Sequence, residues 1–320
     1  MRRFAPPVVV CSAPMDPQAL SVESANIVRH ESAWQRLHRH WSVRIGGAVL
    51  ALLVLTAVCA PWLGTVDPTL FDAASRDLRP GQSGEITTLD GELLKHEFLM
   101  GSDSFGRDIY SRVIYGARVS LLVGIATALL ALAFGIVFGL SAGYLRWLDG
   151  PLMRVMDGLM AIPAILLAIT LVAMWRASLA TVVVAIAITE VPRVTRLVRS
   201  LVLSIREEPY VEAAVSLGTP TLKIMFGHIL PNCLAPLIVQ GTYICASAIL
   251  VEAILSFLGV GLPPDIPTWG NIMSEGRVQF MAYPHNLFFP GVFLAVTVLA
   301  VNILGDGLRD TLDPKMAKRL

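Results

Sequence analysis

The chain has 320 residues, of which 55% are hydrophobic and 15% are charged. A soluble domain carries about 25% charged residues, so this composition excludes an ordinary soluble protein and predicts an all-α integral membrane protein. The formal net charge of +1 leaves no overall basic field that would attract nucleic acid.

Six stretches are candidates for transmembrane helices, each of which needs about 20 mostly apolar residues. The first follows a polar segment, residues 1–44, that ends in a basic stretch. The fourth is the least apolar because it contains Glu190, Pro192 and Arg193. Either that helix leaves the membrane there, or these groups face protein or water. The predicted spans are residues 45–63, 119–143, 155–175, 179–198, 234–258 and 287–304.

The distribution of Lys and Arg predicts how these spans are oriented. If the N-terminus is cytoplasmic, most of the 25 Lys and Arg residues fall in inner segments, and most of the others lie in one long loop. We therefore predict an N-in, C-in protein with six spans. The tails 1–44 and 309–320 are then cytoplasmic, the loop 64–118 is external, and residues 119–308 form the transmembrane core.

The end of the external loop changes character shortly before the second span. Ile109, Val113, Ile114 and Ala117 recur at helical spacing among arginines. This pattern predicts an amphipathic helix that lies on the membrane surface. A gate or a receptor contact is the alternative interpretation of the same stretch.

The second span contains three glycines at intervals of four residues, Gly135, Gly139 and Gly143. Small residues at this spacing share one helix face and allow another helix to approach closely. The spacing therefore predicts a helix-packing site on this face.

Three ionisable residues lie in or beside the predicted spans: Asp157, Glu190 and Glu252. Such groups are costly at membrane depth and usually face the protein interior or a water path. Pairing within the helix bundle and a place on a substrate pathway are both open for them. Glu190 has Arg193 as a possible partner on its own helix.

A polar segment, residues 207–232, separates the fourth and fifth spans and is predicted to be cytoplasmic. Residues 210–217 are good helix formers, and Gly218 suits the left-handed position just after a helix. Thr219 is a suitable N-cap for a second helix over residues 220–230, which Pro231 is expected to interrupt. A folded helix-turn-helix between two spans indicates a contact with something outside the membrane.

The sequence contains no catalytic constellation. It has no phosphate-binding GxxxxGK[ST] loop, and its histidines and four cysteines lack metal-ligand spacing. We expect no catalytic residues, no metal site and no cofactor bound by this chain. A membrane conduit without an energy source of its own suggests a permease driven by a separate motor.

Glu212-Ala213-Ala214, Gly218 and Leu230-Pro231 resemble the EAA loop of bacterial binding-protein-dependent ABC importers. Further stretches are similar to the C-type permease subunit of the dipeptide, oligopeptide and nickel group. They are residues 101–112, 116–121, 252–259 with 269–270, 289–291, and 302–314.

The resemblance implies a type I ABC importer permease fold in the bacterial inner membrane, with a cytoplasmic coupling helix. It implies a pore shared with a second, homologous permease, two ATP-binding subunits that carry ATP and Mg, and an extracytoplasmic solute-binding protein. The ATPase-docking residues implied here are Glu212, Ala213, Ala214, Gly218, Leu230 and Pro231.

The resemblance implies uptake of dipeptides or oligopeptides, with nickel or glutathione as the alternative substrates. An ion-driven secondary transporter is a different hypothesis, and it would use Asp157 and Glu252 as its ion sites. A membrane scaffold without a transport role is a third.

Overall fold

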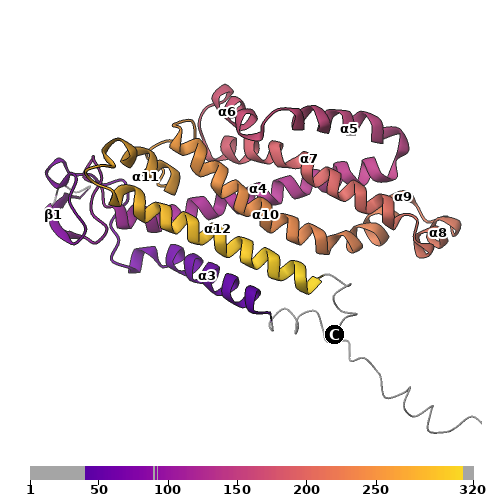
Figure 1. Cartoon of the computed structure of the whole chain (residues 1–320), viewed down its shortest axis with the longest axis horizontal. Helices are drawn as coiled ribbons and strands as arrows, with labels where there is room; N and C mark the ends of the chain where they lie inside the picture. The colour runs from indigo at the N-terminus through magenta and orange to yellow at the C-terminus, as the bar shows by residue number, and fades with distance from the viewer. Residues whose placement is uncertain (1–39, 89–90, 92, 313–320) are drawn as a thin grey trace, which may run out of the picture.

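The computed structural model describes residues 40–88, 91 and 93–312, which form an elongated bundle of helices (Figure 1). Most of the two predicted tails, residues 1–39 and 313–320, lies outside the described residues. The α-helices are α3 Trp41–Val58, α4 Ile109–Tyr144, α5 Arg146–Ala161, α6 Ala164–Met174, α7 Leu179–Ile205, α8 Pro209–Ser216, α9 Thr221–Ile224, α10 Leu230–Phe257, α11 Trp269–Gly276 and α12 His285–Leu312.

Side-chain caps fix where several of these helices begin. Asp108, Ser178 and Thr268 each precede a helix and accept a hydrogen bond from the backbone N–H three residues further on. The first N–H groups of a helix have no partner within it, so such caps satisfy one of them. They mark the starts of α4, α7 and α11.

Within the described residues, four helical stretches are long and apolar enough to cross a membrane: α3, α4, the continuous helix from Thr221 to Phe257, and α12. The number becomes five if α5 and α6 are counted as one bent span. Helix α7 has 27 residues but carries Glu190 and three arginines. The structure thus confirms a mostly helical protein with several candidate membrane spans.

The third predicted span, residues 155–175, is wrong as a single straight helix. The chain breaks at Ile162 and Pro163, and α5 and α6 are bent by 91° at this point. Pro163 has no N–H to donate and disfavours helical backbone at the residue before it. Ile162 accordingly has extended backbone, with φ −91° and ψ 130°.

The predicted external loop contains a small antiparallel sheet, so the expectation of an all-α protein is corrected here. Strand β1 is Gln82–Thr87 and strand β2 is Leu93–Phe98, paired from Gln82 opposite Phe98 to Thr87 opposite Leu93. Ile86 and Phe98 are buried, whereas most other side chains of the two strands are exposed or half-buried. Strands β1 and β2 therefore form a small folded hairpin rather than an open loop.

The predicted surface helix before the second span is also wrong. Residues 109–118 are the first turns of α4, which runs without interruption to Tyr144. Ile109, Val113 and Ala117 are buried against α11, where the Trp269 indole donates a hydrogen bond to the Val113 carbonyl at 3.1 Å. The apolar face that suggested a membrane surface therefore packs on protein.

The glycine face of α4 contacts α7, and these two helices form the most extensive pairing in the bundle. Each of the three glycines lies opposite a valine at a distance that leaves no room for a side chain. Added Cβ atoms would lie 2.4 Å from the valine side chain at Gly135 and Val194, 2.5 Å at Gly139 and Val198, and 2.6 Å at Gly143 and Val202.

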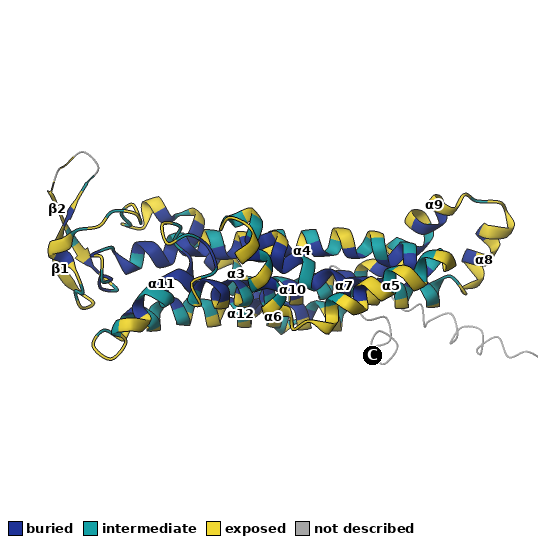
Figure 2. Cartoon of the chain, turned by 90° about the horizontal axis from the view of Figure 1, so that it is seen from above, coloured by how far each residue is buried: buried dark blue, intermediate teal, exposed yellow. Residues whose placement is uncertain are grey.

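The bundle has two different ends. Figure 1 shows β1 and α11 at one end and α8 and α9 at the other. The start of α3 and the end of α12 are directed toward the α8–α9 end. In Figure 2, buried residues follow the middle of the bundle, while α5 and α8 are largely exposed.

Candidate functional site

The segment 207–232 folds into a compact projection beyond the bundle, which we call the knob. Helix α8 ends in a turn at Gly218, whose φ is +75°. The Gly218 N–H donates to the Val215 carbonyl at 2.9 Å, and the Thr219 N–H donates to the Ala214 carbonyl at 3.1 Å. This is the Schellman pattern of helix ends, and the left-handed backbone explains why glycine stands there.

The second helix of the knob differs from its prediction at both ends. Pro220, not Thr219, is the N-cap of α9, and no side chain caps it. After Ile224 the chain continues through a π-helical segment, Met225–Ile229, directly into α10. The expected interruption at Pro231 is therefore wrong, because the chain is helical from Thr221 to Phe257.

The π-helical segment explains how a proline fits beside an uninterrupted helix. In an α-helix the proline ring would clash with the carbonyl four residues earlier. Here the Leu230 N–H donates to the Met225 carbonyl, five residues back, which is the wider π spacing. Pro231 lies in the first turn of α10, so the wider turn comes immediately before it.

The knob presents an exposed surface made of one acidic residue and several small or apolar residues. Glu212, Ala213 and Gly218 are exposed. Leu217 and Leu222 flank the turn with 86% and 68% of their surface accessible. Tyr210, Val215 and Phe226 are also among the exposed large apolar side chains.

The other predicted docking residues lie differently. Ala214 is buried, as is Val211, on the inner side of α8. Leu230 is half-buried and Pro231 is exposed at the base of the knob. The sequence reasoning missed Leu217 and Leu222, although their position on either side of the Gly218 turn was a usable signal.

A hydrogen bond ties the start of α8 to the start of α10. The Asn232 side-chain amide donates to the Tyr210 hydroxyl at 3.1 Å and to the His228 carbonyl at 2.7 Å. Partial burial raises the pKa of Tyr210, and the Glu208 carboxylate acts in the same direction. The phenol therefore stays protonated at neutral pH, and its oxygen accepts this hydrogen bond.

Two of the three predicted ionisable residues pair with arginines of α7. Asp157 accepts a hydrogen bond from Arg196 at 2.5 Å. Glu190 accepts one from Arg193 at 2.9 Å, and the Arg193 guanidinium lies 5.4 Å from the ring centre of Tyr243 on α10. These contacts link α5, α7 and α10.

Glu252 lies apart from both, fully buried near the end of α10. One carboxylate oxygen accepts a hydrogen bond from Ser256 at 2.8 Å. The other has no hydrogen-bond partner among the described residues. Its neighbours Ala253 and Ser256 pack against Gly270 of α11, so Glu252 lies where α10 meets α11.

A buried ion network that the sequence reasoning did not identify lies at the opposite end from the knob. Arg112, only 1% exposed, binds Asp103 at 2.8 Å and Glu275 at 2.7 Å. Arg107 contacts the same two carboxylates. The network joins the predicted external loop and the start of α4 to α11. Only the folded chain brings Glu275 next to residues more than 160 positions away.

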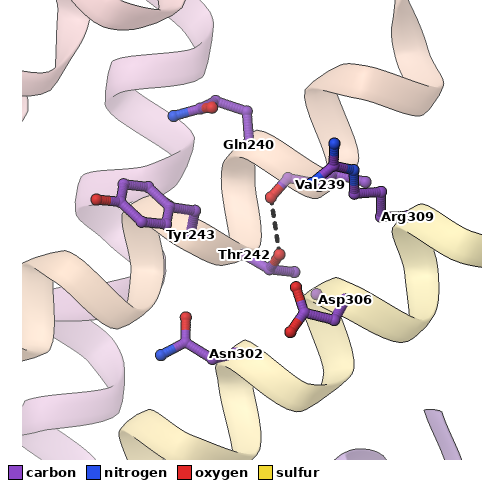
Figure 3. Close-up of a pocket in the computed structure, with 8 residues that line it drawn as sticks. Val239, Gln240, Thr242, Tyr243, Asn302, Asp306 and Arg309 are labelled. Carbon is purple, nitrogen blue, oxygen red and sulfur yellow. Dashed lines mark hydrogen bonds between the residues drawn. The ribbon is translucent and has the colours of Figure 1, made fainter. Parts of the chain in front are cut away.

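A polar groove of about 220 Å³ lies between α10 and α12 (Figure 3). The two helices approach each other closely at this groove, because a Cβ on Gly305 would lie 2.4 Å from the Thr242 hydroxyl oxygen. That hydroxyl donates to the Val239 carbonyl at 2.8 Å. The lining residues are Val239, Gln240, Thr242, Tyr243, Asn302, Gly305, Asp306 and Arg309.

Among residues 40–88, 91 and 93–312, no group of three or more His, Cys, Asp or Glu residues is arranged to hold a metal ion. The features that stand out are thus the knob, the buried ion network and the polar groove.

Comparisons with known proteins agree with one another. Residues 120–318 match the family described as binding-protein-dependent transport system inner membrane component, and residues 31–80 match the N-terminal transmembrane domain of oligopeptide transport permease C. A probable peptide ABC transporter permease protein of Sinorhizobium fredii is 48% identical over 88% of this chain and 91% of its own length.

Two further relatives cover similar shares. The dipeptide transport system permease protein DppC of Alkalihalophilus pseudofirmus is 42% identical over 89% of each chain. A glutathione transport system permease protein of Pectobacterium atrosepticum is 39% identical over 88% of this chain and 90% of its own. Among solved structures, an inward-facing MetNI methionine ABC transporter chain superposes with a TM-score of 0.53 at 17% identity, covering 64% of this chain and 98% of that one.

Proposed function

This chain belongs to the family of binding-protein-dependent transport system inner membrane components, and from that premise we propose that it forms half of the translocation pore of a peptide importer driven by separate ATPase subunits. It is a multi-pass membrane protein and a transport component rather than an enzyme. The observation that carries the proposal is the exposed knob at the end of the continuous helix from Thr221 to Phe257.

The arrangement of the ends supports an N-in, C-in protein with six spans. The start of α3 and the end of α12 are directed toward the knob, and the β1–β2 hairpin lies at the far end (Figure 1). In this proposal the bent pair α5 and α6 is the third span and α7 is the fourth. Charged residues of α7 are paired with other side chains, Glu190 with Arg193 on the same helix and Arg196 with Asp157 of α5.

The knob is the proposed contact with an ATPase subunit. The turn at Gly218 presents Glu212, Ala213 and the flanking leucines outward, and apolar side chains exposed to this extent suit a partner surface. Because α9, the π-helical segment and α10 are continuous, a displacement of the knob is transmitted to the span as a rigid element. ATP-driven movement in the partner would then bias the pore between two states.

The remaining partners follow from the family. We propose that a second, homologous permease completes the pore, that two ATP-binding subunits carry ATP and Mg, and that a solute-binding protein delivers the substrate from outside. The exposed faces of α5 and α6 are available for the second permease. The folded cap of β1, β2 and α11 is the proposed contact for the solute-binding protein.

Peptides are the proposed substrates because the relatives named for a peptide or dipeptide are 48% and 42% identical over most of the chain. A relative named for glutathione is 39% identical, so glutathione is the second candidate substrate. Dipeptides, longer peptides and glutathione are all charged molecules that contain amide bonds.

The test is reconstitution of this chain with its second permease, ATPases and binding protein in proteoliposomes. We expect uptake of a labelled dipeptide that requires ATP and all four components. Proteoliposomes with this chain alone are the control, and uptake by them without ATP would replace the proposal with an ion-driven carrier. Normal solute uptake in a strain that lacks the chain would point instead to a scaffold.

A further inference from the structure

The groove between α10 and α12 contains one acid and one base that are free of each other. Asp306 and Arg309 are exposed, and within the described part of the chain no ion pair or side-chain hydrogen bond engages either of them. Asn302, one turn before Asp306 on the same face of α12, adds an amide. Tyr243 of α10 borders the groove from the other side (Figure 3).

Asp306 and Arg309 lie three residues apart on α12, a spacing comparable to that between the two ends of a short peptide. Side chains three residues apart on a helix start about 5–6 Å from each other. In a dipeptide the two Cα atoms are about 3.8 Å apart, and its ammonium and carboxylate groups each lie one bond beyond them. The groove, at about 220 Å³, is smaller than the usual 300–1,000 Å³ of ligand pockets. It therefore suits the backbone of a short peptide and leaves its side chains outside.

The groove lies on a face of the bundle that is unsuited to lipid. Tyr243, which lines it, is stacked by Arg193, and the exposed pair of Arg196 and Asp157 continues the charged surface across α7 and α5. Charged groups at membrane depth face protein or water. By contrast, the exposed large side chains of α4 between Leu122 and Val137 are all apolar.

We propose that this groove is a subsite on the translocation path that holds the charged ends of a short zwitterionic peptide. Asp306 receives the α-ammonium group, and the Arg309 guanidinium receives the α-carboxylate. Asn302, which lines the groove one turn earlier on α12, is the proposed partner of the peptide amide. The inference rests on the proposed function, because a peptide must enter the pore to reach the groove.

The test uses the purified complex of both permeases and both ATPases without the solute-binding protein, whose own selectivity would mask that of the groove. Binding of labelled alanyl-alanine is measured by equilibrium dialysis. Three unlabelled competitors are compared: alanyl-alanine itself, its N-acetyl derivative, and its C-terminal amide. The N-acetyl derivative lacks the ammonium group, and the amide lacks the carboxylate. The variants are Asp306→Asn and Arg309→Gln. Asp310→Asn, an exposed acid on the same helix outside the groove, is the matched control.

In the unaltered complex, each blocked peptide should compete about tenfold less well than the free one, the size of one charge-assisted hydrogen bond. Asp306→Asn should abolish the discrimination against the N-acetyl form alone. Arg309→Gln should abolish the discrimination against the amide alone, and Asp310→Asn should change neither.

Unchanged discrimination in both variants would overturn the subsite while leaving the proposed function intact, provided that the full transporter still imports the dipeptide. Loss of the second permease from either variant complex on gel filtration would assign the groove to a subunit interface and overturn the proposal. Failure of the unaltered full transporter to import any peptide would instead remove the proposed function on which the inference rests.

Discussion

Gly139 of α4 lies so close to Val198 of α7 that a Cβ on the glycine would stand 2.5 Å from the valine Cβ and 2.9 Å from the Thr195 carbonyl oxygen. Real Cβ atoms do not approach this closely, so a side chain at Gly139 must push the helices apart. The same relation one turn before and one turn after makes α4 and α7 a single packed unit.

We expect Gly139→Ala to destabilise the protein by about 1–3 kcal/mol, the cost of inserting a methyl group into a filled core. The measurement is thermal unfolding in detergent. Gly158→Ala is the control, because nothing lies within 4 Å of its added Cβ. The exchange Gly139→Val with Val198→Gly keeps both the volume and the number of helical glycines. It should recover most of the loss, and failure to recover any would contradict this account.

Gly218→Pro should uncouple ATP hydrolysis from transport while the protein still inserts. Proline cannot adopt the φ of +75° found at this residue, so the turn between α8 and α9 must change shape. Glu212→Lys, which reverses an exposed charge on the same surface, should have a similar effect. Peptide uptake and ATPase rate are measured together in proteoliposomes.

Gly227→Ala is the matched control for these variants. Gly227 is also an exposed glycine of the knob, but its φ is not positive and its added Cβ has nothing closer than 4.0 Å. Uptake at the normal rate by the Gly218→Pro or Glu212→Lys protein would remove the knob from the coupling route.

The π-helical segment sets the rotation of the knob relative to α10. Pro231→Ala removes the ring that the wider turn accommodates, so it should let Met225–Ile229 become α-helical. An α turn holds one residue fewer than a π turn, and each residue of an α-helix turns the chain by about 100°. With the number of residues unchanged, the knob would rotate by about that angle and lose its alignment. We expect normal expression and lost coupling, and coupled transport by the variant with an α-helical segment would show that this alignment is unimportant.

Arg112→Gln should destabilise the protein by about 3–5 kcal/mol, because it leaves the Asp103 and Glu275 carboxylates buried with only Arg107 beside them. Arg196→Gln removes an ion pair whose two side chains are 45% and 53% exposed, and it should cost about 1 kcal/mol or less. Thermal unfolding in detergent compares the two. Equal losses would mean that burial of the network does not matter.

The proposed orientation is tested by labelling single cysteines with a maleimide that cannot cross membranes. Leu93 and Leu217 are exposed at opposite ends of the bundle. In a background that lacks the native cysteines, Leu93→Cys should react in intact spheroplasts, and Leu217→Cys should react only after the membrane is opened. The reverse pattern would invert the topology.

Local sequence was a good guide wherever a feature depended on neighbouring residues alone. Gly218 predicted the residue with left-handed backbone that follows the end of α8, since few other residues adopt that backbone without strain. The interval of four residues between Gly135, Gly139 and Gly143 predicted close helix packing without identifying α7 as the partner. The missing nucleotide loop and the order of the family motifs indicated a permease that depends on a separate motor.

Sequence reasoning was less successful where two interpretations differ only in what covers a surface. The apolar spacing of residues 109–117 fits a helix on a membrane as well as one packed on protein, and only the Trp269 contact distinguishes them. Pro163 and Pro231 look alike as helix breakers. One produces a 91° bend, whereas the other follows a π-helical turn that absorbs it.

The sequence by itself determined the helical membrane class, the position of the knob and the family, because these depend on composition, short-range backbone preferences and motif order. The tertiary structure alone decided that Arg112 lies between Asp103 and Glu275, and that Asp306 and Arg309 border a groove with Tyr243. These relations join residues from distant parts of the chain. The strength of such contacts depends on the burial of the charged groups and on the distances between them, and both are set only after the helices have packed.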